Sequence, residues 1–203
     1  MTYKRCRRSC KHKRDQKAFE QRYAILKAFL DAESKDQCSL YYFDESGFSL
    51  IPNVPYAWQE ISETLAIPSQ HSRRLNVLGF LSQRGELHYS ATEGKVTSEV
   101  VIAAFDDFIQ QTDDDKPRVI VIDNASMHTS RLFREAQDKW LEKNVHIVRL
   151  PTYSPELNLI EILWRMVKYY WVNLSAYVDF DSLKEEVIRV LNDYGTKYEI
   201  NFV

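Results

Sequence analysis

Two apolar runs separated by one helix-sized segment constrain the fold more than any other feature of this sequence. Residues 117–126, PRVIVIDNAS, and residues 145–151, VHIVRLP, are rich in β-branched side chains and are each short enough for one buried strand. Residues 128–143, between them, are predicted to be helical. Two strands joined through a helix run parallel in one sheet, so the sequence predicts an α/β domain.

The first half of the chain adds strands of another kind. Residues 39–46, SLYYFDES, form a short aromatic and apolar strand, and residues 47–58 suggest a second short strand followed by an irregular loop. Residues 74–82 and 85–92 are predicted to pair as a hairpin around the turn QRG. The predicted sheet is therefore mixed.

Helical periodicity marks the rest of the chain. Apolar side chains recur at helical spacing in four further segments, residues 15–32, 97–111, about 158–172 and 179–195. Thr97 or Ser98 is expected to cap the second of these. With 203 residues, the chain is long enough for one domain with a substantial core.

Three carboxylates stand at element boundaries. Asp44 ends the run YYFD and Asp123 ends VIVID, and sites in open α/β sheets gather just beyond such strand ends. Glu161 lies in the first turn of the helix predicted from about residue 158. Neighbouring carboxylates repel unless one takes a proton or a cation lies between them, and Mg²⁺ prefers oxygen ligands. The pattern predicts a metal site.

Each carboxylate also has a structural explanation. Asp44 and Asp123 could accept backbone hydrogen bonds in turns. Glu161 could form a capping box with Asn158, or an ion pair with Arg165 one helical turn away. Spacing alone leaves these alternatives open.

Charge is distributed unevenly. Residues 1–17 contain eight Lys or Arg against one Asp, a charge of +7, so the remainder carries −9 of the net −2. Such an arm suits a phosphate backbone, with Lys4, Arg5, Arg7 and Arg8 as candidate contacts, or is a solvated tail. There is no membrane-length apolar run and no secretory signal, and the odd number of cysteines fits a reducing cytoplasm.

Three blocks, FDESGF, VIDNASMHTS and LPTYSPELNLIEILWRMVK, resemble the catalytic motifs of DDE transposases of the insertion-sequence (IS six-thirty type) and Tc/mariner superfamily. The third block is the most specific. The resemblance implies a ribonuclease-H-like fold, as in retroviral integrases, with a mixed five-stranded sheet flanked by helices. It divides the chain into a basic arm and linker helix, residues 1–37, and a catalytic domain, residues 38–203. Helix-turn-helix modules that precede this domain in relatives are not in the sequence.

The same resemblance assigns the site. Asp44, Asp123 and Glu161 match the catalytic, metal-binding triad, which implies two Mg²⁺ ions, or Mn²⁺ in their place. Glu156 and Glu45 are rivals for the third and first positions. Glu161 fits the N-x-I step of the motif, and Glu45 follows Asp44 in a strand, so its side chain points to the other face.

The implied activity is cleavage of double-stranded DNA at transposon ends and strand transfer into target DNA, typically at TA. The implied assembly is a homodimer on paired ends in the bacterial cytoplasm, associated with the nucleoid and not with a membrane. Two alternatives are a catalytically dead remnant that only binds DNA or dimerises, and a nuclease of another kind on the same fold.

Five further residues are candidates for supporting roles. Asn124 could orient Asp123 or touch a phosphate, or simply form a turn. His128 could contact the scissile phosphate or brace the triad, or be a structural histidine. Arg73, Arg74 and Lys168 are candidate phosphate contacts, although Lys168 could equally be a solvated lysine.

Overall fold

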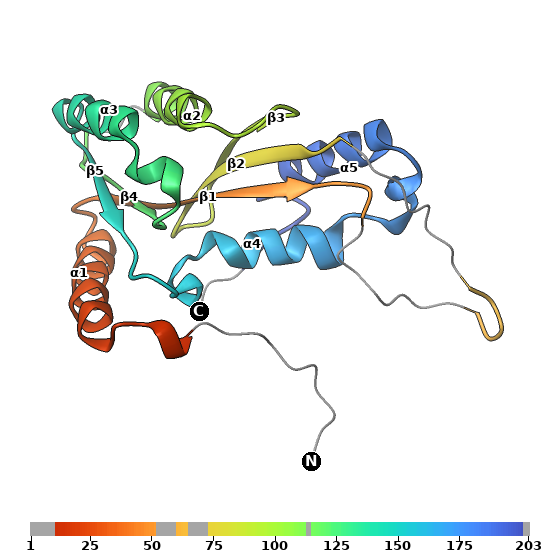
Figure 1. The fold of residues 1–203 in the computed structure, drawn as a ribbon, viewed down its shortest axis with the longest axis horizontal. Coiled ribbons are helices and arrows are strands. Elements are labelled where there is room, and N and C mark those ends of the chain that lie inside the picture. The colour runs from red at the N-terminus through yellow and green to blue at the C-terminus, as the bar shows by residue number, and fades with distance from the viewer. Residues whose placement is uncertain (1–10, 52–59, 65–72, 113–114, 201–203) are drawn as a thin grey trace, which may run out of the picture.

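Helices cover both faces of one central sheet (Figure 1). The computed structural model describes residues 11–51, 60–64, 73–112 and 115–200. Its main elements in chain order are α1 (Gln16–Ser34), β1 (Ser39–Phe48), β2 (Leu75–Ser82), β3 (Leu87–Thr92), α2 (Ser98–Gln111), β4 (Arg118–Ile122), α3 (Arg131–Glu142), β5 (Val145–Arg149), α4 (Ile160–Met166) and α5 (Phe180–Asn192). A π-helical turn, Val167–Trp171, continues α4.

The sheet confirms the mixed five-stranded topology. Its strand order is β3-β2-β1-β4-β5. β1 pairs antiparallel with β2, and β2 pairs antiparallel with β3 through the predicted hairpin. β1 pairs in parallel with β4, and β4 pairs in parallel with β5 through α3, as the two apolar runs predicted. β1 is therefore the central strand and joins the two halves.

Alternating side chains of the strands supply two cores. On one face, Leu40 and Tyr42 of β1 pack with α1, α4 and α5. On the other face, Tyr41 and Phe43 pack with α2 and α3. The same alternation continues along β1, so the side chain of Asp44 lies on the α4 face of the sheet and that of Glu45 on the face covered by α2 and α3.

Two predicted elements differ from those observed. The helix expected over residues 128–143 is divided into a 3-10 turn, Ser126–Thr129, and α3. Ser130 is extended between them, and its hydroxyl accepts a hydrogen bond from the backbone of Phe133, which starts α3 afresh. His128 therefore precedes the helix.

The second short strand expected within residues 47–58 is wrong where the structure describes it. Gly47 and Phe48 simply continue β1, paired with Asn76 and Leu75. A Cβ at Gly47 would lie 1.9 Å from Nε of Arg74, so the glycine allows that guanidinium to lie across the strand. Residues 52–59 lie outside the described part.

The linker helix α1 packs against the body of the protein. Leu26 is buried in the core beside α4 and α5, and Oε1 of Glu33 accepts a hydrogen bond from the backbone of Leu40 at 3.4 Å. The division of the chain near residue 38 stays a prediction. Within the described residues, no helix is long and apolar enough to span a membrane.

Candidate active site

Asp44 lies within β1, at the level where β4 ends. The parallel pairing of β1 with β4 reaches only Tyr42 and Val121, whereas the antiparallel pairing with β2 continues and places Asp44 opposite Gly79. The sequence predicted that Asp44 follows the end of a strand. The strand instead runs on to Phe48 because β2 remains beside it.

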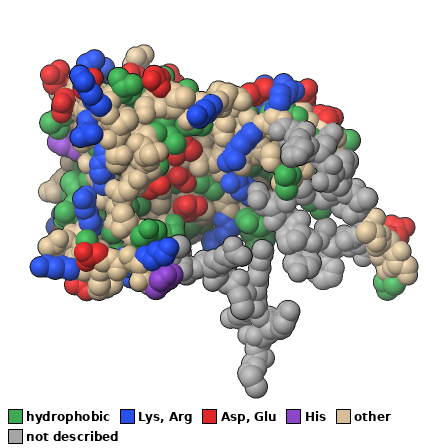
Figure 2. All heavy atoms as spheres, viewed as in Figure 1, with side chains coloured by type: hydrophobic (Ala, Val, Ile, Leu, Met, Phe, Trp, Pro, Cys, Tyr) green, Lys and Arg blue, Asp and Glu red, His purple; other side chains and the backbone are tan. Residues whose placement is uncertain are grey.

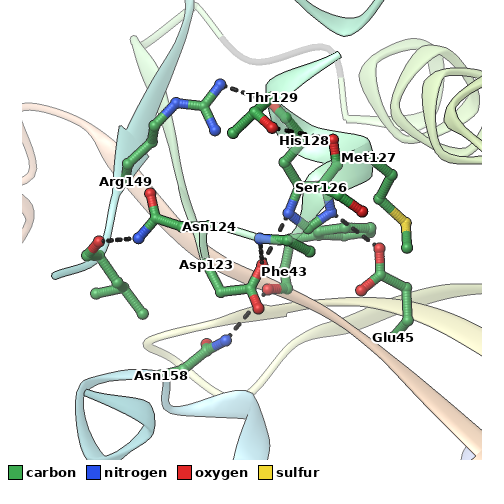
Figure 3. Close-up of polar contacts among 12 residues, drawn as sticks. Phe43, Glu45, Asp123, Asn124, Ser126, Met127, His128, Thr129, Arg149 and Asn158 are labelled. Atoms are coloured by element: carbon green, nitrogen blue, oxygen red, sulfur yellow. Dashed lines mark hydrogen bonds and ion pairs between the residues drawn. The ribbon is translucent and has the colours of Figure 1, made fainter. Parts of the chain in front are cut away.

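Asp123 directly follows β4 and is held through one oxygen. Its Oδ1 accepts a hydrogen bond from the backbone N–H of Ala125 at 2.9 Å and lies 2.8 Å from Nδ1 of His128 (Figure 3). The first contact is that of a turn-forming aspartate, so this alternative describes part of what Asp123 does. Both contacts use Oδ1 and leave Oδ2 to the cavity that Asp123 lines.

Glu161 lies in the first turn of α4, and neither structural alternative accounts for it. The helix is capped at Leu159 without a side-chain hydrogen bond, and Nδ2 of Asn158 donates instead to the carbonyl of Phe43 at 3.3 Å. Among the described residues, Glu161 forms no ion pair with Arg165. Its carboxylate is left to the cavity.

One cavity of about 430 Å³ brings the three carboxylates together. Asp44, Asp123 and Glu161 line it, and residues 150–155 of the third motif block form much of the remaining wall. Figure 2 shows acidic side chains in the middle of this face, with Lys and Arg side chains on either side of them. The topology thus gathers one residue from each block at a single site.

The two rival carboxylates are engaged elsewhere. Glu45 points to the opposite face of the sheet, as predicted, and its Oε1 lies 2.9 Å from Nε2 of His128. Glu156 forms an ion pair with Arg14 at 3.0 Å. Neither lines the cavity.

Burial and mutual repulsion shape the electrostatics. Burial raises the pKa of Asp44 to about 8, and the charges of Glu161, Glu45 and Asp123 add to the shift. Burial and Asp123 also raise the pKa of Glu161, against the opposing charge of Lys168. Burial favours a raised pKa for Asp123 too, but hydrogen bonds from His128 and Ala125 outweigh it and lower that pKa. The cavity therefore combines two carboxyl groups with a raised pKa, those of Asp44 and Glu161, and one with a lowered pKa, that of Asp123.

Comparison with known families agrees with this geometry. Residues 39–184 match the DDE superfamily endonuclease family. The chain belongs to this family. An uncharacterized protein of Sinorhizobium fredii (strain NBRC 101917 / NGR234), y4pE/y4sA, is 26% identical over 74 residues, which make up 36% of this chain and 50% of that protein.

Solved structures show that this DDE endonuclease domain has the ribonuclease-H-like fold of transposases and integrases. The Mos1 transposase paired-end complex with left transposon end has a TM-score of 0.56 at 14% identity and covers 95% of this chain and 64% of that chain. The catalytic core domain of BIV integrase has a TM-score of 0.50 at 13% identity and covers 80% and 86%. The chain thus spans less than two thirds of the Mos1 chain and half of the curated relative. The predicted fold is confirmed.

The donor set of this domain suits a hard divalent cation by its chemistry. Asp44, Asp123 and Glu161 are oxygen ligands, and Oδ1 of Asn158, another cavity residue, is buried without a hydrogen-bond partner. A cation would relieve the repulsion that raises the pKa of Asp44. In the described part of the chain, no three His, Cys, Asp or Glu side chains converge closely enough to hold an ion as they stand. The side chains around the cavity are therefore of the types that bind such a cation, but they do not converge on one point.

Several polar side chains fix the segments around the cavity (Figure 3). Asn124, a predicted supporting residue, donates from Nδ2 to the carbonyl of Leu150 at 2.6 Å, which joins the ends of β4 and β5. Asn158 joins the third block to β1. Arg149 donates to the carbonyl of His128 at 2.7 Å. Sequence reasoning missed Arg149, although a charged residue that ends a buried strand was a usable signal.

The predicted basic contacts divide into two groups. Lys168 lies close enough to the acidic groups for their charges to act on it: burial and Arg74 lower its pKa, while Glu161 and Asp44 oppose the shift. Arg73 is instead held by Glu93 at 3.0 Å and by a second carboxylate on α5. Lys4, Arg5, Arg7 and Arg8 lie outside the described residues.

Proposed function

We propose that this domain is the catalytic core of a transposase, which cleaves DNA phosphodiesters at the ends of a mobile element and joins those ends to target DNA. One observation carries the proposal: Asp44, Asp123 and Glu161, one from each motif block, line a single cavity. Relatives of the same fold include the Mos1 paired-end and strand transfer complexes. Membership of the DDE superfamily endonuclease family supports it further.

The carboxylates would hold Mg²⁺ or Mn²⁺, by the resemblance two ions. When bound, such ions activate the attacking oxygen and stabilise the leaving oxygen in phosphoryl transfer. Burial raises the pKa of Asp44 to about 8, so Asp44 would give up a proton on becoming a metal ligand. Asp123 contributes a carboxylate already oriented by His128 and Ala125. Lys168 places a positive charge beside the acidic groups, where a DNA phosphate would approach.

The finer parts of the proposal come from the family resemblance. They are a TA target, a homodimer on paired ends and action on chromosomal DNA in the bacterial cytoplasm. Mos1 complexes are described with Mn and with Mg, which supports a divalent cofactor here. Because the chain spans only part of its relatives, contacts that select the transposon ends are expected from segments beyond it.

Nicking of supercoiled plasmid in Mn²⁺ at low salt tests the cleavage step. We expect the wild type to nick, and Asp44→Asn, Asp123→Asn and Glu161→Gln each to lose at least about 100-fold in rate, because each removes a candidate ligand. Glu156→Gln is the matched control, since it removes a nearby carboxylate that does not line the cavity. Equal rates in wild type and triad variants would refute the assigned site.

Strand transfer distinguishes a transposase from another nuclease. A duplex with a free 3′-hydroxyl at the element's end is incubated with plasmid, and joined products are sequenced. Joined products, most at TA, would support the proposal. Nicking without joining would favour a simple nuclease, and neither activity, even with end-binding modules supplied, would favour a catalytically dead remnant.

A further inference from the structure

A buried imidazole connects the two faces of the sheet at the candidate active site. The side chain of His128 is fully buried, and both of its ring nitrogens contact carboxylates. Nδ1 lies 2.8 Å from Oδ1 of Asp123, and Nε2 lies 2.9 Å from Oε1 of Glu45 (Figure 3). A neutral imidazole has one donor and one acceptor nitrogen, whereas both partners of this ring are carboxylates, which accept hydrogen bonds.

The surroundings of His128 prevent the ring from turning. Phe43 and Phe133 pack against it with ring centroids 5.6 Å away in each case. Its own carbonyl accepts a hydrogen bond from Arg149 at 2.7 Å. The imidazole is thus a rigid spacer of fixed length between its two carboxylate partners.

Glu45 holds the end of the His128 ring that faces away from Asp123. It directly follows Asp44 on β1, but its side chain lies on the other face of the sheet. The path from Asp44 through the backbone to Glu45, then through His128 to Asp123, joins two candidate ligands by covalent bonds and two short contacts. Asp123 is also fixed on the same oxygen by Ala125, so its rotation is restricted and Oδ2 is the oxygen left for the cavity.

We propose that Glu45 is a positioning residue: through His128 it sets the orientation of Asp123 and its separation from Asp44, and thereby the affinity of the site for a divalent cation. This inference rests on the proposed function, because it presumes that the cavity binds a metal. Glu45 itself touches neither metal nor DNA in this scheme. Removal of such outer partners typically costs about 10–100-fold in metal affinity.

Two conservative substitutions of Glu45 distinguish the effect of its side-chain length from the effect of its charge. Glu45→Gln keeps an oxygen acceptor at the same distance from the backbone and removes the charge. Glu45→Asp keeps the charge and withdraws the carboxylate by one methylene, so the contact with Nε2 of His128 is lost. Because the proposal concerns geometry, we expect the Asp variant to be the more damaging.

The test is Mn²⁺ affinity, measured by isothermal titration on the full chain, with circular dichroism to establish the folded fraction. We expect Glu45→Gln to bind within about 3-fold of wild type and Glu45→Asp to bind at least about 10-fold more weakly. Glu33→Ala is the control: it removes another buried carboxylate, which accepts a hydrogen bond from Leu40 far along β1 from the cavity. It should lower the melting temperature without changing Mn²⁺ affinity.

Two kinds of result would overturn the inference: one in the Glu45 variants and one in the wild type. If folded Glu45→Asp binds Mn²⁺ as tightly as wild type, or if Glu45→Gln weakens binding as much as Glu45→Asp, then Glu45 does not position the site. If the wild type binds no Mn²⁺ at all, the metal site of the proposed function fails and this inference falls with it. A melting temperature lowered in Glu45→Asp with unchanged affinity would assign Glu45 a purely structural role.

Discussion

The two sides of the cavity are built differently. On one side, Asp123 receives a backbone hydrogen bond and a contact from a buried histidine, and its pKa is lowered. On the other side, burial and neighbouring carboxylates raise the pKa values of Asp44 and Glu161. Protein groups satisfy the Asp123 side, whereas the Asp44–Glu161 side is left electrostatically unfavourable.

This difference separates two properties of the site: the orientation of one carboxylate and the electrostatic energy of the other two. The Asp123 side offers a carboxylate in a fixed orientation. The Asp44–Glu161 side carries unfavourable electrostatic energy that a cation would relieve, so this side would strengthen cation binding. Substitutions that affect one side and spare the other therefore test whether the two sides differ in this way.

Substitution of the two aspartates should change the free energy of unfolding most, and in opposite directions. In EDTA at pH 7.5, Asp44→Asn should raise the free energy of unfolding by roughly 2 kcal/mol, because it removes a buried carboxyl group that must hold a proton in the folded state. Asp123→Asn should lower it by roughly 2 kcal/mol, because charge-assisted hydrogen bonds become neutral ones. Urea denaturation of both variants measures this. Changes of the same sign would contradict the comparison.

A substitution at Gly79 should disturb only the Glu161 side. A Cβ there would lie 2.8 Å from Cη2 of Trp164 and 3.0 Å from Cδ1 of Ile160, so Gly79→Ala must push α4 away from β2. We expect a loss of about 1–2 kcal/mol in stability and at least a 10-fold loss of nicking, since small displacements of a catalytic group are costly. Melting curves and plasmid nicking measure both effects.

Gly94→Ala is the matched control for that experiment. A Cβ at Gly94 would meet only Oγ1 of Thr92 at 3.5 Å, an ordinary contact. It should leave nicking unchanged. If Gly79→Ala behaved like Gly94→Ala, close packing of α4 on β2 would not be what places Glu161.

The pH dependence of stability in EDTA should also reflect Asp44, with a slope of about 1 kcal/mol per pH unit. The pKa of Asp44 is about 8 in the folded protein, above its ordinary value of 3.8, so the folded state holds a proton that the unfolded state has lost. Stability should therefore fall as the pH rises from about 4 to about 8. Asp44→Asn should be flatter from pH 5 to 6.5 in denaturation at stepped pH.

Above pH 6.5 a second group contributes in the same direction. Contacts with Asp123 and Glu45 outweigh burial and raise the pKa of His128 to about 9 from 6.5, so its contribution is lost as the pH passes through 9. Asp44→Asn should keep this later fall. A wild type whose stability rises between pH 5 and 8 would show that Asp44 is not strained.

The sequence predicted the sheet well where local pattern and tertiary packing agree. The runs at residues 117–126 and 145–151 are apolar because both faces of those strands are covered, so periodicity sufficed. It failed at Gly47 and at Ser130. Glycine suggested an interruption, but β2 continues beside it, and Ser130 caps a new helix inside a segment whose composition is helical throughout.

The members of the candidate site were more predictable than its connections. The resemblance of the three motif blocks to a known family assigned Asp44, Asp123 and Glu161, and all three line one cavity in the structure. The contact of Glu45 with His128 joins residues 83 positions apart in the sequence, so no local pattern encodes it. The same is true of the bond from Asn158 to Phe43.

The central place of β1 has a consequence for how the protein opens. Strands lie on both sides of Tyr41 and Tyr42, so their backbone amides are shielded by the whole sheet. Amide exchange at these positions should require global unfolding, whereas α1 and the segment before α4 can exchange through local fluctuations. Asp44 follows two residues later on the same strand. Asp44, whose pKa burial and neighbouring charges raise, is thus carried by a strand expected to exchange slowly, where local fraying would not relieve its unfavourable environment.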